Sequence, residues 1–344
     1  MSATEAQAGP VRGLDAAALG DILGAMLDLV RGHEDELNRL NVFPVRDHDT
    51  GTNMALTLEG VVKAVEATRG RPMRELAGAV VDAAMLEARG NSGTILSEAL
   101  RGMFETWAPL DLVGPADLVR GFRAAADRAE QSVLNPVEGT ILTVARVTAD
   151  AMEELAPAEL DVLLAGAAEA AGRAVQATTA QLAVLRRAGV VDAAARGFEL
   201  CVRAFAAAVA GEDGKAPTDG ARAGRPAPSQ GHPAAEAPGH AAEGPAAGEA
   251  PGHAAGEPSP AFEVQYLLAC GEDDVRELER YLATIGDSIT VARGDGRCRV
   301  HLHTDDAGAA IEAATRRGPV SRIEVAYLGD GVRSDRSGDG ARSD

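Results

Sequence analysis

The segment Asn41-Val-Phe-Pro-Val-Arg-Asp47-His-Asp49-Thr-Gly-Thr-Asn-Met54 lies between two stretches of helical periodicity. Asp47 and Asp49 stand two residues apart, and hard carboxylate oxygens at this spacing can converge on one divalent cation such as Mg²⁺. The pair also suits a turn and a helix N-cap, and spacing alone favours that interpretation. An EF-hand is excluded, because Thr52 stands where that loop needs glycine and Leu58 where it needs a bidentate glutamate.

Polar turns open four of the expected helices. Thr50-Gly-Thr-Asn53 leads into one helix and Arg89-Gly-Asn-Ser-Gly-Thr94 into another. Backbone N–H groups at a helix start attract phosphate, and glycine lets them approach an anion closely. Asn135-Pro-Val-Glu-Gly-Thr140 and Gly189-Val-Val-Asp192 open two more helices. Ordinary capping explains each turn taken alone, but in an antiparallel helical barrel all four would gather at one rim.

Helical periodicity dominates residues 14–210. Apolar residues recur at three- and four-residue spacing from Leu19 to Val30. Similar patterns cover residues 56–68, 75–88, 93–107, 115–133, 140–154, 159–177 and 194–209. The composition is rich in alanine and only 3% aromatic, which favours closely packed helices over a β-sandwich. This part of the chain is therefore predicted to be an all-α domain of about eight helices.

The composition changes sharply after the helical part. Residues 211–260 are mostly Gly, Ala, Pro, Glu and His, with few large apolar side chains. Such a segment cannot bury enough surface to offset its ordering entropy, so a disordered linker is predicted there. Disordered ends are predicted at residues 1–13 and 330–344. Residues 261–329 predict the order βαββαβ, with a hairpin around Gly294-Asp-Gly296, which is typical of a ferredoxin-like α+β domain.

The bulk properties exclude several classes of protein. A net charge of −19 argues against nucleic acid as a main partner, because a phosphate backbone needs a basic surface. No stretch approaches the ~18–20 apolar residues of a membrane span, and no signal peptide is evident. The three cysteines, Cys201, Cys270 and Cys298, are few and widely spaced, so reduced thiols are expected. These features predict a cytoplasmic protein.

Four long motifs stand out together: Leu40–Met54, Ala88–Ser97, Pro136–Val144 and Ala188–Asp192. They resemble the nucleotide-binding domain of the dihydroxyacetone kinase L-subunit (DhaL-type) family, most closely its branch in the fatty acid kinase A subunit. The segment from Phe262 to Leu328, with Gly286-Asp-Ser288 and His301-Leu-His-Thr-Asp305, resembles the middle domain of that protein. The resemblance implies an eight-helix antiparallel barrel over residues 14–210 that binds ATP or ADP with Mg²⁺ at one end.

The resemblance also implies roles for individual residues. Asp47 and Asp49 would be catalytic and would hold Mg²⁺, with the amide oxygen of Asn41 as a third ligand. The nucleotide and its phosphates would be contacted by Thr50, Thr52, Asn53, Gly90, Asn91, Ser92, Gly93, Thr140 and Asp192. The implied chemistry is metal-assisted transfer of the γ-phosphate, which depends on positioning and charge neutralisation more than on covalent chemistry.

The family further implies a metal site in the middle domain, built from a cysteine and a His-x-His pair. His301 and His303 alternate along one predicted strand and therefore share a face. Glu263 stands where the cysteine is usual, and a carboxylate can bind Zn²⁺, so an altered zinc site is one interpretation. Two histidines on the surface of a strand are the alternative. The chain departs from the family pattern elsewhere as well, since His48 stands where glycine is usual between the two aspartates.

The resemblance implies a kinase component that phosphorylates a fatty acid held by a separate fatty-acid-binding carrier protein (DegV-like). The chain ends where the family's C-terminal carrier-binding domain would begin, which is expected to affect docking of the carrier. Two alternatives stay open: the ATP-binding component of a dihydroxyacetone (glycerone) kinase, and a non-catalytic nucleotide-binding regulator. The oligomeric state is open as well, a homodimer included.

Overall fold

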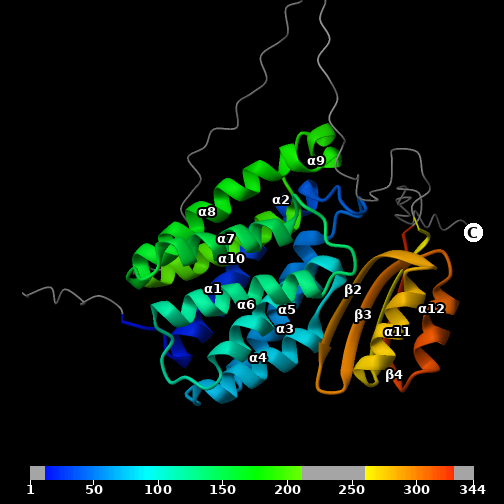
Figure 1. Ribbon diagram of the computed structural model, residues 1–344, viewed down its shortest axis with the longest axis horizontal. Coiled ribbons are helices and arrows are strands. Elements are labelled where there is room, and N and C mark those ends of the chain that lie inside the picture. Colours follow the sequence, from blue (N-terminus) through cyan, green and yellow to red (C-terminus); the bar gives the residue numbers. More distant parts are fainter. Residues whose placement is uncertain (1–11, 211–259, 329–344) are drawn as a thin grey trace, which may run out of the picture.

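Figure 1 shows the computed structural model of the chain, which describes residues 12–210 and 260–328. A helical domain and a small sheet-containing domain lie side by side. Nearly all of the expected linker (211–260), and most or all of the expected disordered ends (1–13 and 330–344), lie outside the described residues. Within the described ranges, no helix is both long enough and apolar enough to cross a membrane.

The first domain is all-helical, as predicted. Its eight long helices are α1 (Ala16–Gly32), α3 (Thr50–Glu66), α4 (Met73–Glu87), α5 (Gly90–Trp107), α6 (Pro115–Gln131), α7 (Ile141–Leu155), α8 (Leu160–Gln181) and α10 (Ala193–Ala210). Two short helices, α2 (Glu34–Leu40) and α9 (Ala183–Ala188), complete the set in residues 12–210. Each short helix spans two turns or fewer, which is too short for periodicity to reveal.

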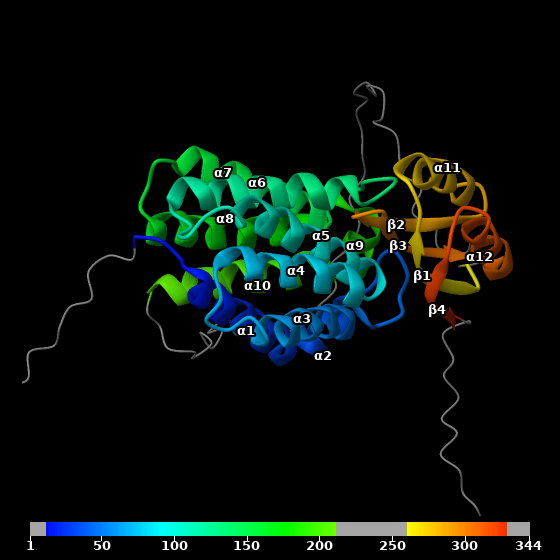
Figure 2. The same ribbon diagram turned by 90° about the horizontal axis from the view of Figure 1, so that it is seen from below.

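The long helices pack in a ring. Each one contacts the next in the order α1, α3, α4, α5, α6, α7, α8 and α10, and α10 contacts α1 again. Figure 2 shows the helices lying roughly side by side, with the second domain at one end of the bundle. The stripe from Leu19 to Val30 faces inward, and the side chain of Asp15 caps α1 by accepting from the backbone N–H of Ala18 at 2.9 Å.

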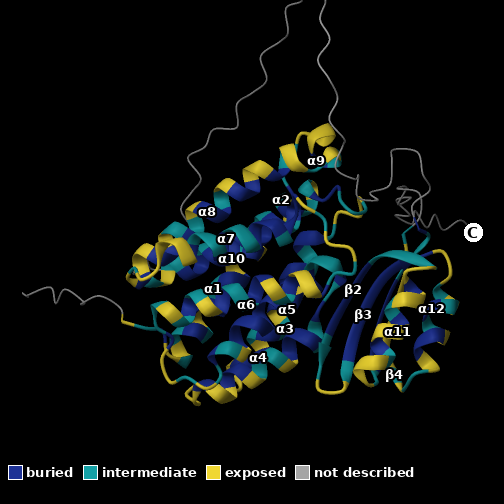
Figure 3. Ribbon diagram, in the orientation of Figure 1, coloured by how far each residue is buried: buried dark blue, intermediate teal, exposed yellow. Residues whose placement is uncertain are grey.

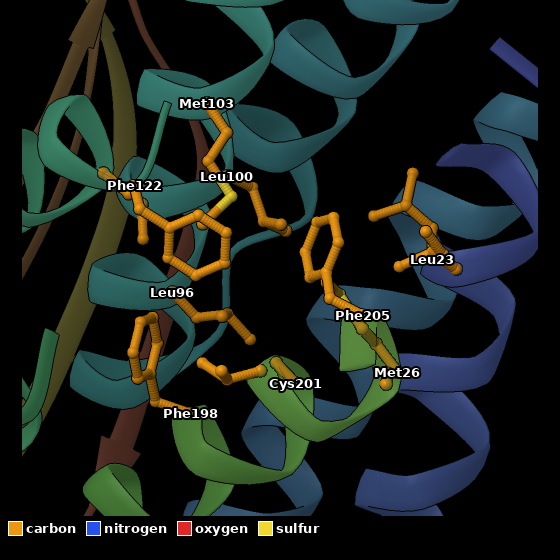
Figure 4. Close-up of a cluster of buried hydrophobic side chains, with 14 of the residues drawn as sticks. Leu23, Met26, Leu96, Leu100, Met103, Phe122, Phe198, Cys201 and Phe205 are labelled. Carbon is orange, nitrogen blue, oxygen red and sulfur yellow. The ribbon is translucent and has the colours of Figure 1, made fainter. Parts of the chain in front are cut away.

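Edge-to-face aromatic contacts fill the centre of the helical domain. The ring of Phe205 lies 5.5 Å from that of Phe122 and 6.1 Å from that of Trp107, centroid to centroid. Figure 4 shows Phe205 and Cys201 projecting from the same helix into a cluster of aliphatic side chains. Cys201 is buried, and no disulfide joins any of Cys201, Cys270 and Cys298 in the structure.

The second domain has the predicted order βαββαβ. Its elements are β1 (Phe262–Ala269), α11 (Glu272–Leu282), β2 (Gly286–Gly294), β3 (Arg297–Thr304), α12 (Ala307–Thr315) and β4 (Val320–Tyr327). The strands form one antiparallel sheet in the order β2-β3-β1-β4, which is the ferredoxin-like arrangement. Asp295 (φ 47°) and Gly296 (φ 70°) form the tight turn between β2 and β3, as Asp-Gly pairs do in two-residue hairpins.

The two faces of this sheet differ in chemistry. Val264, Tyr266 and Leu268 of β1 belong to the apolar core that α11 and α12 cover. The alternate residues of the strands point to the other face. That face lies against the helical domain and carries buried polar side chains, including Arg299 and His301. Figure 3 shows that β3 is buried over most of its length. The domain interface is therefore polar on the side of the sheet.

Backbone hydrogen bonds join the two domains at the edge strand β2. The N–H of Leu134 donates to the carbonyl oxygen of Ile289 at 3.2 Å, and the N–H of Val291 donates to that of Ser132 at 2.8 Å. Nearby, Arg101 of α5 donates to the carbonyl oxygen of Arg293 at 2.6 Å. The segment after α6 thus extends the sheet by one short bridge and fixes the sheet against the bundle.

The aromatic cluster makes one prediction about stability. Phe205→Ala should lower the free energy of unfolding by about 3–5 kcal/mol, because Phe205 is 1% exposed and its loss leaves a cavity. Chemical denaturation followed by helical circular dichroism measures this loss. Val162→Ala in α8 is the matched control, since Val162 is 49% exposed, and a loss of equal size there would contradict the prediction.

Candidate active site

The first turn of α3 is capped by a side chain from another helix. Oδ1 of Asn38, in α2, accepts from the backbone N–H of Gly51 at 2.7 Å and of Thr52 at 3.2 Å. Asp49 stands at the N-cap position, but its side chain accepts no capping hydrogen bond. The N-cap interpretation of Asp49 is therefore wrong. An amide from α2 satisfies the helix start, and the carboxylate is left for other partners.

Asp47 and Asp49 lie against each other. Asp47 is exposed as a residue, but its carboxyl group is directed at that of Asp49 and hydrogen-bonds it. Nδ2 of Asn41 donates to Oδ1 of Asp47, and the side chain of Asn53 hydrogen-bonds Asp49. Burial of the carboxyl group and then the charge of Asp49 raise the pKa of Asp47 to about 8. Two adjacent carboxylates cannot both ionise cheaply without a cation, so this geometry suits one.

His48 turns away from the acidic pair. Its backbone is left-handed, with φ of 60°, which explains why glycine is the favoured residue between the two aspartates. Its Nδ1 lies 3.0 Å from the carbonyl oxygen of Asn38. The imidazole therefore braces the loop against α2 and leaves the space beside the carboxylates clear.

The start of α5 forms a second wall beside the acidic pair. The backbone N–H of Arg89 donates to Oγ1 of Thr57 at 3.1 Å, which holds this turn against α3. Gly90 has a left-handed backbone, with φ of 57°, and a Cβ there would overlap the side chain of Asn53. Oδ1 of Asn91 is buried without a hydrogen-bond partner among the described residues. A buried amide oxygen of this kind suits a polar ligand or water.

The sheet of the second domain forms the third wall. His301 and His303 are 1% and 3% exposed, with ring centroids 5.1 Å apart, so the interpretation as surface histidines is wrong. Nδ1 of His301 lies 3.4 Å from Oε1 of Glu263. Burial raises the pKa of Glu263, but His301, His303 and Gln265 outweigh that effect and bring it to about 2. Glu263 therefore stays ionised across the physiological range.

The three walls enclose one narrow pocket. Of the residues singled out in the sequence, it is lined by Asn41, Asp47, Asp49, Thr50, Asn53, Gly90, Asn91, Ser92, Glu263, His301 and His303. Most of the residues expected at an Mg²⁺–nucleotide site thus share a single pocket with those expected at a separate zinc site. The sequence predicts two sites, because nothing local relates residues more than 200 positions apart.

Two predicted phosphate contacts lie outside this pocket. Oγ1 of Thr52 donates to Oε1 of Glu34 at 2.7 Å, so this hydroxyl faces α2. A Cβ at Gly93 would overlap Oγ1 of Thr57. Gly93 therefore permits the close packing of α5 on α3 and does not open toward a ligand.

Thr140 and Asp192 lie at the same end of the bundle but also outside the pocket. Oδ1 of Asp192 accepts from the backbone N–H of Ala195 at 2.8 Å, and a second backbone bond comes from Ile141. These bonds join the starts of α10 and α7, while Gly197 of α10 packs on Met54 at the start of α3. Four helix starts therefore gather at one rim, as expected. Burial raises the pKa of Asp192 to about 6, despite the two backbone bonds.

The zinc site implied by the family is not supported. In the described parts of the chain, no group of three or more His, Cys, Asp or Glu side chains is placed to hold a metal ion. Zinc needs three or four protein ligands. Glu263 and His301 instead lie side by side as a buried pair, with Nδ1 of His301 3.4 Å from Oε1 of Glu263. Mg²⁺ in phosphate-handling sites takes only one or two carboxylates and completes its shell with water and phosphate oxygens, so the acidic pair meets that smaller need.

Several residues of the site escape prediction from the sequence. Asn38 caps α3 from α2, a helix too short to be detected in the sequence. The only sequence signal for this role is that asparagine is a common capping residue. Phe43, Pro44 and Val45 line the pocket beside the acidic pair. Their apolar character gives no hint of a polar site.

The capping role of Asn38 makes a prediction. Asn38→Ala should lower the free energy of unfolding by about 1–2 kcal/mol, because two N–H groups of α3 lose their acceptor. Asn38→Asp keeps an acceptor oxygen and should lose less. Thermal or chemical denaturation measures both. Equal stability of the alanine variant and the unaltered chain would contradict the capping role.

The buried carboxyl group of Asp192 makes a second prediction. Its pKa is about 6 in the folded state and near 3.8 in the unfolded chain. Between these values the folded protein binds more protons, so the free energy of unfolding falls as pH rises from about 4 to 6, by up to about 3 kcal/mol. Asp192→Asn keeps a capping oxygen but cannot titrate. The stability of the unaltered chain relative to this variant should therefore decline over that interval, and a constant difference would contradict it.

Comparisons with known proteins agree with this architecture. A family model for the DAK2 domain matches residues 44–207, and a model for the middle domain of fatty acid kinase A-subunit-like proteins matches residues 259–334. Protein YloV of Bacillus subtilis is 28% identical over 324 residues, which cover 92% of this chain and 56% of that protein. An uncharacterized protein of Staphylococcus saprophyticus is 38% identical over 182 residues, covering 52% of this chain and 33% of its own length.

A crystal structure of dihydroxyacetone kinase from C. freundii, in complex with AMP-PNP and Mg²⁺, matches with a TM-score of 0.43 and 17% identity, over 60% of this chain and 36% of that one. The chain spans between a third and slightly more than half of the length of these two curated relatives. The two family models fall on the two domains of the structure. The chain therefore joins a DAK2 domain to a middle domain of the fatty acid kinase A-subunit type and belongs to the DAK2-domain (DhaL-type) family, close to the fatty acid kinase branch.

Proposed function

We propose that this chain is an ATP-dependent phosphotransferase component that binds Mg²⁺–ATP in the pocket between the two domains. One observation carries the proposal: Asp47 and Asp49 lie together, and Asp49 leaves its helix start to be capped by Asn38. Carboxylates that only cap a helix or terminate a turn would bond to backbone N–H groups. The pair instead shares a hydrogen bond in a pocket whose other walls carry backbone N–H groups and glycine.

The residues present fit Mg²⁺. Asp47 and Asp49 would hold the ion, and hard oxygen donors are what this ion prefers. The amide oxygen of Asn41 would be a further ligand once the amide turns over, since Nδ2 faces Asp47 in the structure. Bound Mg²⁺ would neutralise phosphate charge during transfer. Thr50 and Asn53 stand at the start of α3, where the helix dipole favours an anion. Because Asn38 occupies the N–H groups of Gly51 and Thr52, the side chains of Thr50 and Asn53 would make the phosphate contacts.

The rest of the nucleotide would extend along the rim of helix starts. Gly90, Asn91 and Ser92 offer a second helix start to the phosphates, and Thr140 and Asp192 would line the nucleotide farther out. The ring order of the long helices supports the eight-helix antiparallel barrel that the family implies. In such a barrel all these starts lie at one end. The carboxylate of Asp192 supports this, since it accepts from the backbone N–H groups of Ile141 in α7 and Ala195 in α10.

The proposed acceptor is a fatty acid presented by a separate carrier protein. The match to a middle domain of the fatty acid kinase type favours this acceptor over dihydroxyacetone. A carboxylate acceptor is already ionised and needs no general base. His301 lines the pocket, and its Nε2 has no hydrogen-bond partner in the described part of the chain, so this side chain would orient the incoming carboxylate.

Transfer of labelled γ-phosphate from ATP to carrier-bound fatty acid tests the proposal. Asp49→Asn should reduce the transfer rate by about 100-fold or more, because one charged ligand and the electrostatic stabilisation it supports are lost. Asp28→Asn is the matched control. Asp28 is an exposed aspartate on α1, and its substitution should leave the rate unchanged.

Two other outcomes have defined meanings. Binding of Mg²⁺–ATP without transfer to any carrier-bound fatty acid would favour a nucleotide-binding regulator. Absence of any Mg²⁺-dependent nucleotide binding, in equilibrium dialysis or calorimetry, would overturn the whole proposal.

A further inference from the structure

The turn that leads into the start of α5 is held by the second domain. Nη1 of Arg89 lies 2.6 Å from each carboxylate oxygen of Glu324. Glu324 belongs to β4, the edge strand of the sheet, and Arg89 directly precedes Gly90 of the pocket wall. Arg89 belongs to the helical domain and Glu324 to the second domain. The ion pair therefore connects the candidate phosphate-binding turn with a strand that itself lines no part of the pocket.

Three further bonds hold the end of α4, immediately before this turn. The carbonyl oxygen of Leu86 accepts from Arg322 at 2.7 Å and from Arg299 at 3.2 Å. Arg322 also lies 3.0 Å from Oε1 of Glu87. The last carbonyls of a helix lack partners within the helix, so cationic donors there are favourable. Residues 86–89 are thus held at both ends by side chains of β3 and β4.

The backbone of β4 is shaped to make these contacts. Arg322 has a φ of 50°, which is rare for a residue with a side chain, and the β1–β4 register breaks beside it, between Gln265 and Leu267. Such a bulge re-aims a side chain and bends the strand. A strained backbone persists only where its surroundings require it. Here the side chain of Arg322 reaches α4 from the bulge.

The contacts form one network, which distinguishes them from isolated surface ion pairs. Arg299 is 1% exposed and lies within 3.2 Å of Oε1 of Gln265 and 3.9 Å of Oε1 of Glu324. Isolated exposed pairs contribute little, but a network anchored on a buried guanidinium restricts its members more strongly. Glu324 is the member that faces Arg89 directly.

We propose that Glu324 is a positioning residue for the turn Gly90–Ser92. By holding Arg89, it fixes the direction in which the N–H groups of this turn point. This inference rests on the proposed function, because it takes the turn to be a phosphate-binding element. It assigns part of the nucleotide site's geometry to a residue of the second domain that lines no part of the pocket.

Nucleotide binding by variants of the full chain tests the inference. Titration with ADP and Mg²⁺ should show Kd raised about threefold to fivefold in Glu324→Ala and to the same extent in Arg89→Ala. The double alanine variant should bind no more weakly than either single variant, since both remove one contact. Glu324→Asp keeps the negative charge that faces Arg89 and Arg299, so it should retain most of the affinity that Glu324→Ala loses. An equal loss in the aspartate and alanine variants would contradict the positioning role.

Glu312→Ala is the matched control. Glu312 pairs with Arg316 at 2.6 Å, the same distance as the Arg89 pair, but on the outer helix α12. Its substitution should leave Kd unchanged. The inference is overturned if Glu324→Ala binds as the control does, or more tightly, while the unaltered chain binds the nucleotide.

Hydrogen exchange without nucleotide separates this inference from the proposed function. Amides of residues 88–94 should exchange faster in Glu324→Ala than in Glu312→Ala, and those of α8 should not change. If amides 88–94 exchange faster in Glu324→Ala but the unaltered chain binds no nucleotide, the positioning contact is supported and the proposed function is overturned. Unchanged exchange would overturn the positioning contact whatever the nucleotide result.

Discussion

The capping of α3 by Asn38 is the interaction on which the candidate site depends. A helix start has N–H groups without partners, and a nearby aspartate ordinarily satisfies them. Because an amide from α2 does so instead, Asp49 can meet Asp47 in the pocket. The short helix α2 supplies this cap, and His48, with its left-handed backbone, contacts the carbonyl oxygen of Asn38. The local fold therefore leaves two carboxyl groups together in the pocket, where an aspartate cap would have turned one of them to the helix start.

The second domain contributes to the site through the unusual chemistry of its sheet. One face is an ordinary apolar core under two helices, whereas the other buries Arg299, His301 and His303 against the helical domain. Buried charges persist only when they are paired or satisfied. Glu263 lies beside His301, and the carbonyl oxygen of Leu86 and Oε1 of Gln265 accept from Arg299. The relative position of the two domains is therefore restricted, because each buried guanidinium group needs an acceptor at a particular place.

Periodicity and turn chemistry were enough to predict the long helices, the βαββαβ order and the hairpin at Asp295. They could not reveal α2, since seven residues show no clear period, nor therefore the cap from Asn38. Local pattern alone favoured capping roles for the acidic pair and Gly90, and the family resemblance implied their place in a site; they line one pocket. That His301 shares this pocket could not be predicted, because the contact joins distant segments. Thr52 and Gly93 match the family motif in type, but the hydroxyl of Thr52 bonds Glu34 in α2 and Gly93 packs against Thr57 in α3. Sequence alone does not show which way a motif residue faces.

The polar inner face of the sheet has a consequence for how the two domains hold together. Ionic and hydrogen-bonded contacts between partly exposed groups weaken as ionic strength rises, whereas apolar cores do not. Arg89, Arg322 and their acceptors lie partly in solvent, while the bonds of Ser132 and Leu134 to β2 are between backbones. Added salt would therefore loosen the side of the interface next to the pocket before the side at β2. Ionic strength would therefore affect how firmly the second domain is held against the helical domain beside the pocket.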